Sequence, residues 1–120
     1  MIGVGHPVEV TYALPGPIPA GNYHLVGDGV ISAMPMVQFD LLWREPGSQD
    51  STIVSFTHQY PSGTAAQYEE TKSGAAVAAV NGDLIVLRVT MLSTDPNSEY
   101  VPIAEHPPTP TARFLSVDIP

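Results

Sequence analysis

The longest nearly unbroken apolar run of the chain covers residues 83–92. Four of its residues are β-branched, a composition typical of strands: Ile85, Val86, Val89 and Thr90. Turn-forming residues flank the run, with Asn81-Gly82 before it and Ser-Thr-Asp-Pro-Asn after it. A buried helix also fits a run of this length, but β-branching and flanking turns favour a central strand that is buried on both faces. We therefore expect the remaining segments to pack around it.

Alternating apolar and polar positions predict further strands. Residues 6–14 place Val8, Val10 and Tyr12 on one face, which predicts a half-buried strand. Residues 36–44 and 52–60 also alternate, and the Pro-Gly-Ser turn between them predicts that they form a hairpin. Shorter strands are expected at residues 22–26, 30–33, 75–80, 100–104 and 113–119, the last with Leu115, Val117 and Ile119 facing inward. The prolines at 107–110 predict a stiff loop.

Glycine-containing turns predict how some strands pair. Asn81-Gly82 predicts a two-residue type I′ hairpin that places Ala79 opposite Leu84. Gly27-Asp28-Gly29 predicts a second hairpin, between residues 22–26 and 30–33, and residues 95–98 predict a type I turn. Residues 64–73 contain several helix formers, so one or two helical turns are the alternative to the extended edge segment that we favour there.

These segments amount to eight or nine short strands, separated by turns roughly every ten residues. Two stacked antiparallel sheets satisfy such a pattern, so we expect an all-β chain that folds as a β-sandwich of jelly-roll or immunoglobulin-like type. A closed barrel is the alternative. The length of 120 residues fits a single domain over residues 1–120.

Charge and composition restrict the partners and the compartment. The net charge of −8 opposes binding to nucleic acid or to an anionic membrane. No apolar stretch approaches the roughly 20 residues of a membrane-spanning helix. No cysteine is present, so disulfides and thiolate chemistry are excluded. The first residues lack a basic and an apolar leader region, which predicts either a cytoplasmic protein or a mature region without its leader.

The sequence contains none of the catalytic motifs that we sought. A Gly-x-Ser-x-Gly elbow, a His-Glu-x-x-His pair and a phosphate-binding glycine loop are missing, so we predict no enzyme activity and no cofactor. The four histidines lie far apart in sequence, and a half-buried, hydrogen-bonded His58 is favoured over a metal ligand. Residues 95–106 begin like a calcium loop, but Tyr100 replaces the required glycine and His106 the required glutamate. A plain turn is therefore expected there, with an irregular calcium site as the alternative.

The aromatic residues and Arg88 suggest where a ligand could bind and which side chains are buried. Tyr23, Tyr68 and Tyr100 lie near predicted turns, where they would offer platforms to a glycan or a protein ligand. Trp43 shares a face with apolar residues and is expected in the core. Arg88 lies within the central apolar run, so we expect either a buried pair with Asp40 or a position at the sheet rim with its guanidinium in water.

The segments Phe-Asp-Leu-Leu-Trp-Arg at 39–44, Gly-Asp-Leu-Ile-Val-Leu-Arg at 82–88 and Leu-Ser-Val-Asp-Ile-Pro at 115–120 resemble β-sandwich regions of secreted lipoproteins of myxobacteria and related bacteria. The resemblance implies an exported, non-catalytic protein at the bacterial cell surface with a glycan or protein ligand. It carries over no functional residue, and the lipid-bearing cysteine of such proteins is absent from this chain. A structural protein that forms a homo-oligomer, fibre or shell through its sheet edges is the alternative, and a hydrolase or metal enzyme is the least favoured hypothesis.

Overall fold

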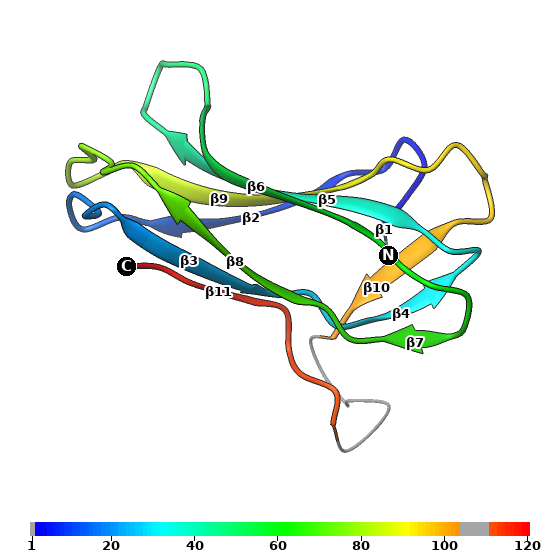
Figure 1. Cartoon of the computed structure of the whole chain (residues 1–120). Helices are drawn as coiled ribbons and strands as arrows, with labels where there is room; N and C mark the ends of the chain where they lie inside the picture. Colours follow the sequence, from blue (N-terminus) through cyan, green and yellow to red (C-terminus); the bar gives the residue numbers. More distant parts are fainter. Residues whose placement is uncertain (1, 104–110) are drawn as a thin grey trace.

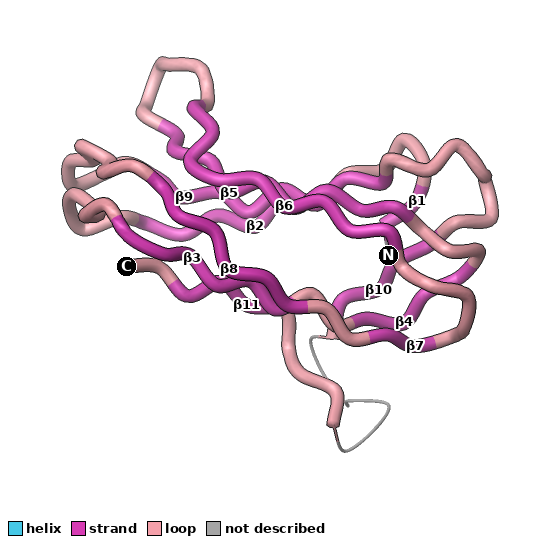
Figure 2. Tube along the Cα trace, in the orientation of Figure 1, coloured by secondary structure: helices cyan, strands magenta, loops and turns pink. Residues whose placement is uncertain are grey.

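The computed structural model describes residues 2–103 and 111–120. This part of the chain is all-β, and Figure 2 shows strands joined by loops and turns without a helix. Its strands are β1 (Ile2–Gly3), β2 (Val8–Ala13), β3 (Gly21–Val26), β4 (Gly29–Ser32), β5 (Met36–Arg44), β6 (Ser51–Gln59), β7 (Ala65–Ala66), β8 (Glu69–Gly74), β9 (Leu84–Met91), β10 (Glu99–Pro102) and β11 (Ser116–Asp118). Among the described residues, no helix is long and apolar enough to cross a membrane.

The strands form two layers, as Figure 1 shows. One layer is a sheet in the order β2-β9-β5-β6, and the other contains the sheets β11-β3-β8 and β1-β10-β4-β7. The second layer bends between its two sheets, because β3 continues into β4 and β7 into β8 with only two residues between each pair. The amide of Gly27 donates to the carbonyl of Tyr68 at this bend, over an N–O distance of 2.8 Å. The predicted antiparallel β-sandwich is therefore confirmed.

The core lies between the layers and is built from the alternation that predicted the strands. Val37 and Phe39 of β5 and Phe56 of β6 are buried there. The central apolar run forms β9, which lies between β2 and β5 and pairs with both. Its neighbouring residues Ile85 and Val86 point to opposite faces and are only 7% and 0% exposed. The prediction of a central strand is therefore confirmed, but its outer face is fully buried only at Val86, since Arg88 and Thr90 are half-buried.

Other local predictions are also confirmed. β5 and β6 form the expected antiparallel hairpin, and residues 64–73 are extended as β7 and β8. The amide of Ser98 donates to the carbonyl of Asp95, which closes the predicted turn. The strand expected at 75–80 is wrong: only Val77 pairs there, in an isolated bridge with Ile18. The described chain nevertheless has eleven strands instead of eight or nine, because the two-residue β1 is additional and residues 64–73 supply both β7 and β8. The loop predicted at 107–110 lies outside the described residues.

The predicted hairpin at Asn81-Gly82 is wrong. A turn does form, since the amide of Asp83 donates to the carbonyl of Val80, and Gly82 has a φ of 105°. Asn81 does not have the positive φ that a type I′ turn requires at both central residues, so the geometry is that of a type II turn. Residues 75–80 do not pair with β9, because β2 and β5 already occupy both of its edges.

The predicted hairpin at Gly27-Asp28-Gly29 is also wrong. β3 pairs with β8 and β11, whereas β4 pairs with β10 and β7, so this segment is a corner between two sheets. The glycines allow close packing instead of a hairpin turn: a Cβ at Gly29 would lie 2.3 Å from Cε1 of Tyr100.

Two predictions of burial need correction at the sheet edges. β2 forms as expected, but all six of its residues are exposed instead of half-buried, because it is the edge strand of its sheet. At the C-terminus, Leu115 and Val117 pack against the core as predicted, whereas Ile119 is 46% exposed. Both corrections concern one side of the sandwich, where β2 and β11 border an opening.

Candidate functional site: an open apolar cleft

A cleft of about 440 Å³ lies between the two layers on the side of β2 and β11. Tyr12, Leu14, Ile85 and Leu87 line it from the first layer, and Leu115 and Val117 line it from the second. No charged side chain belongs to its lining in the described part of the chain. The cleft therefore suits an apolar group and disfavours a charged one, which would lose its hydration there.

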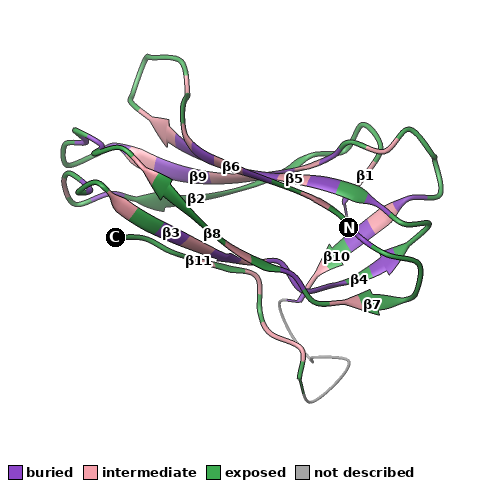
Figure 3. Cartoon of the chain, viewed as in Figure 1, coloured by how far each residue is buried: buried purple, intermediate pink, exposed green. Residues whose placement is uncertain are grey.

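In the first layer, β2 has apolar side chains beside this cleft that the second layer does not cover. Val8, Val10 and Tyr12 share the face of β2 that points toward the second layer, yet they are 38%, 40% and 62% exposed. Figure 3 shows β2 in the colour of exposed residues. On the opposite side of the sandwich, β6 and β8 contact each other. The sandwich is thus open at the β2 side, where it presents a surface of apolar side chains.

The backbone of β2 also presents an unpaired edge. Val10 lies opposite Leu87 and Tyr12 opposite Ile85, while the amide of Leu14 donates to the carbonyl of Asp83. Because hydrogen-bonding direction alternates along an antiparallel strand, Val8, Val10 and Tyr12 bond to β9. The N–H and C=O groups of Glu9, Thr11 and Ala13 consequently point away from the sheet, and β2 has no second strand partner among the described residues.

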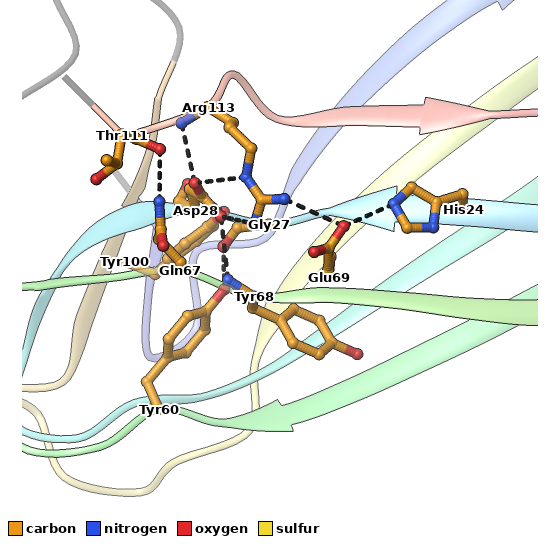
Figure 4. A network of polar contacts seen from close by, with 10 residues as sticks. All are labelled: His24, Gly27, Asp28, Tyr60, Gln67, Tyr68, Glu69, Tyr100, Thr111 and Arg113. Atoms are coloured by element: carbon orange, nitrogen blue, oxygen red, sulfur yellow. Dashed lines mark hydrogen bonds and ion pairs between the residues drawn. The ribbon is translucent and has the colours of Figure 1, made fainter. Parts of the chain in front are cut away.

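The other wall of the cleft, β11, is fixed by a buried carboxylate. Asp28 is 1% exposed, and its Oδ2 accepts hydrogen bonds from the backbone N and from Nε of Arg113 at 2.9 and 3.1 Å. Its Oδ1 accepts from Nη2 of Arg113 and from the backbone N of Tyr68, each at 3.0 Å. Figure 4 shows Arg113, in the C-terminal segment of residues 111–120, reaching to Asp28 at the corner between β3 and β4. The amide of Leu115 then donates to the carbonyl of Ile103, and β11 pairs with β3.

The environment of Asp28 keeps its carboxylate charged inside the protein. Burial by itself raises the pKa of Asp28, but the hydrogen bonds and the positive charge of Arg113, together with the amide of Tyr68, outweigh burial and lower it. The guanidinium of Arg113 also contacts Glu69 at 3.1 Å. The C-terminal segment is therefore held by a charge pair, with one partner buried and the other half-buried.

Two buried tyrosines support the same corner from the core. The hydroxyl of Tyr60 donates to the carbonyl of Gly27, and that of Tyr100 donates to the carbonyl of Asp28 at 3.2 Å. Their rings stack with centroids 5.4 Å apart. Burial raises the pKa of both hydroxyls, which consequently remain protonated donors.

The structure places the three tyrosines predicted as binding platforms inside the protein. Tyr23, Tyr68 and Tyr100 are 0%, 9% and 0% exposed, so the expected position on the surface is wrong for all three. Tyr68 stacks on the half-buried His58 with ring centroids 4.0 Å apart. Tyr12 is instead the exposed tyrosine. Its alternation with Val8 and Val10 indicated a core-facing position, and no signal in the sequence shows that β2 is an edge strand.

Three polar side chains, those of Thr71, His24 and Glu69, are connected on the outer surface of the second layer. Nδ1 of His24 lies 2.7 Å from Oγ1 of Thr71, and its Nε2 lies 2.9 Å from Oε2 of Glu69. This order of hydroxyl, imidazole and carboxylate has the connectivity of a hydrolase triad. However, Thr71 and Glu69 are exposed on adjacent positions of a sheet face, outside the apolar cleft, and catalysis also requires a site that holds the substrate and its developing charge. We interpret these contacts as cross-strand side-chain pairing that joins β8 to β3.

Arg88 lies on the outer surface of the first layer with its side chain 34% exposed, so of the two expected arrangements the buried pair with Asp40 is wrong and the guanidinium in contact with water is nearer to the structure. Its guanidinium contacts Glu9 at 2.6 Å and Asp50 at 3.1 Å. Asp40 lies opposite Arg88 in the sheet but accepts hydrogen bonds from Gln38 and Ser55. The hydrogen bond from Arg88 lowers the pKa of Glu9, so this residue beside the open edge is an ion-paired carboxylate.

Among the described residues, no group of three or more histidine, cysteine, aspartate or glutamate side chains is placed to hold a metal ion. The side chain of Asp95 accepts a hydrogen bond from the amide of Asn97, which is the geometry of an Asx turn. No family model matches the chain, and no match was found among curated proteins or solved structures.

Proposed function

We propose that the chain is a non-catalytic β-sandwich module, exported to the bacterial cell surface, which binds a protein ligand at the cleft between β2 and β11. The observation that carries this proposal is the uncharged cleft beside exposed apolar side chains of β2. Its volume of about 440 Å³ falls within the range of ligand pockets, and a surface of this kind is typical of interaction sites. Export and surface location are supported by the resemblance to secreted lipoproteins.

A protein ligand fits the cleft better than a glycan does. Sugar rings require aromatic platforms together with hydrogen-bonding groups, but three of the candidate platforms are buried tyrosines. The exposed Tyr12 does line the cleft, but its neighbours there are mainly aliphatic. The indole N–H of Trp43 is bonded to Asp83 over 2.9 Å and does not point into solvent. The cleft itself is lined mainly by aliphatic side chains, which suit the apolar residues of a protein.

Selection from a random peptide library displayed on phage tests this proposal directly. We expect enriched peptides that bind the wild-type chain and bind Val10→Lys at least tenfold more weakly, because the lysine places a charge on the cleft face of β2. Val101→Lys is the matched control, since Val101 is 38% exposed and Val10 is 40% exposed. Peptides that bind all three proteins equally would place the binding site elsewhere.

A glycan array probed with the same three proteins tests the choice of ligand class. We expect no glycan whose binding depends on Val10. A glycan that binds the wild type and loses affinity only for Val10→Lys would refute the choice of a protein ligand.

Self-assembly is the second candidate function, and the open edge of β2 favours it. An edge strand with exposed apolar side chains is a template for pairing with another copy. Light scattering over a concentration series distinguishes the two functions. A protein-binding module remains a monomer, whereas self-assembly gives oligomers that Val10→Lys dissociates.

A further inference from the structure

We propose that the ligand is an extended segment of another protein, which adds to β2 as an antiparallel strand and places alternate apolar side chains over the cleft. This inference rests on the proposed function and specifies its partner. The ligand that we infer has apolar residues at alternate positions, polar uncharged residues between them and basic residues at its ends.

The backbone of β2 determines the type of ligand. Glu9, Thr11 and Ala13 direct their N–H and C=O groups away from β9, and these groups match the hydrogen-bonding pattern of another strand. Pro7 and Pro15 lack N–H groups and therefore limit the pairing to the residues between them. An apolar small molecule would leave these backbone groups without protein partners, whereas a strand bonds to them.

The side chains of β2 determine the register of the ligand. Residues directly opposite each other in an antiparallel pair lie on the same face of the sheet. Ligand residues opposite Val10 and Tyr12 would therefore face the cleft, toward Leu115 and Val117 of the second layer. A shift of one residue would turn the polar residues of the ligand into the cleft, so the alternation of the ligand selects one register.

The charges around the edge favour a ligand of another protein over a second copy. Edge strands often avoid unwanted pairing through a charged residue, but the charge of Glu9 is compensated by Arg88 and by Arg44, 3.3 Å away. The three arginines form ion pairs and Lys72 donates to the carbonyl of Ser55, while the whole chain carries a net charge of −8. The electrostatic field of this net negative charge attracts a ligand with basic ends and repels another copy of the chain.

Synthetic peptides with defined backbone changes test the inference. The probe is a fluorescein-labelled octapeptide that alternates valine and threonine between terminal arginines, measured by fluorescence anisotropy against the wild-type chain. A peptide of the same composition with its valines and threonines in separate blocks is the control. We expect at least tenfold weaker binding of the block peptide, and at least tenfold weaker binding of the alternating peptide to Val10→Lys but not to Val101→Lys.

N-methylation distinguishes strand addition from general apolar binding. In the inferred register the threonines lie opposite Glu9, Thr11 and Ala13, so their amides donate to β2, whereas the valine amides point to solvent. Methylation of the threonine amides is expected to reduce affinity at least tenfold, and methylation of the valine amides to leave it within about twofold.

Three results would overturn the inference. Equal effects of the two methylation patterns would exclude strand addition while the proposed binding at the cleft could still stand, because display-selected peptides test that function separately. No binding of the alternating peptide at millimolar concentration would exclude the inferred ligand class. Self-association that Val10→Lys abolishes, in place of peptide binding, would assign the edge to a second copy.

Discussion

Replacing Asp28 by asparagine tests whether the buried charge pair holds the C-terminal segment. The asparagine keeps the size of the side chain but removes the charge and exchanges an acceptor oxygen for an NH₂ group, which faces donors of Arg113 or Tyr68. Breaking a buried ion pair costs about 3–5 kcal/mol. Because the side chain of Arg113 is 38% exposed and water can solvate the freed guanidinium, we expect a loss of about 2–3 kcal/mol in the free energy of unfolding.

Urea unfolding followed by Trp43 fluorescence measures this loss. Glu45→Gln removes an equal charge from an exposed residue and is expected to change the free energy of unfolding by less than about 0.5 kcal/mol. Amide exchange at Leu115 and Val117 should accelerate in Asp28→Asn, because Arg113 precedes both residues along the chain. If Asp28→Asn is as stable as Glu45→Gln, the charge pair does not anchor this segment.

The same variant should alter the dependence of stability on pH. The pKa of Asp28 in the folded protein lies below its ordinary value of about 3.9, so the carboxylate stabilises the fold fully above that pH. The stabilisation is lost as the pH falls through the lower, folded-state pKa. The difference in unfolding free energy between wild type and Asp28→Asn should therefore be largest near neutral pH and decrease below about pH 4. A difference that stays constant between pH 2 and pH 7 would contradict this assignment.

Three further substitutions test the packing and turns, each by chemical unfolding. Gly29→Ala should cost about 3 kcal/mol or more, because its Cβ would lie 2.3 Å from the ring of Tyr100. Gly16→Ala should be nearly neutral, because its Cβ would meet no described atom within 4 Å apart from its chain neighbours. Tyr23→Phe should leave stability unchanged or raise it by up to about 1 kcal/mol, because the Tyr23 hydroxyl is buried and has no hydrogen-bond partner among the described residues; a clear loss would indicate a partner. Asn81→Pro should be tolerated within about 0.5 kcal/mol, because a type II turn accepts proline there; strong destabilisation would favour type I′.

The sequence predicted most of the strands, apart from the one expected at 75–80, but fewer of their partners, for a physical reason. Alternation and β-branching are local properties, so β5, β6 and β9 could be recognised from their own residues. Pairing is a property of the whole fold. Asn81-Gly82 does form a turn, yet the edges of β9 bond to β2 and β5, which lie far away in the sequence.

The candidate site was less predictable than the fold because each part depends on distant residues. Asp28 and Arg113 are separated by 85 positions, and neither shows by itself that the other is its partner. Tyr12 alternates with Val8 and Val10 in the same way as a core-facing residue. Its exposure has two causes: β2 is an edge strand, and the opposite layer does not extend far enough to cover it. Both depend on how the whole chain folds.

Hydrogen–deuterium exchange along β2 in the dilute free protein, measured by NMR, tests the central claim that this strand is an open edge beside the cleft. The account predicts rapid exchange of the amides of Glu9, Thr11 and Ala13, which point to solvent, and slow exchange at Val10 and Tyr12, which bond to β9. Slow exchange at all five amides would show that this edge is already covered, and would contradict the proposed binding site.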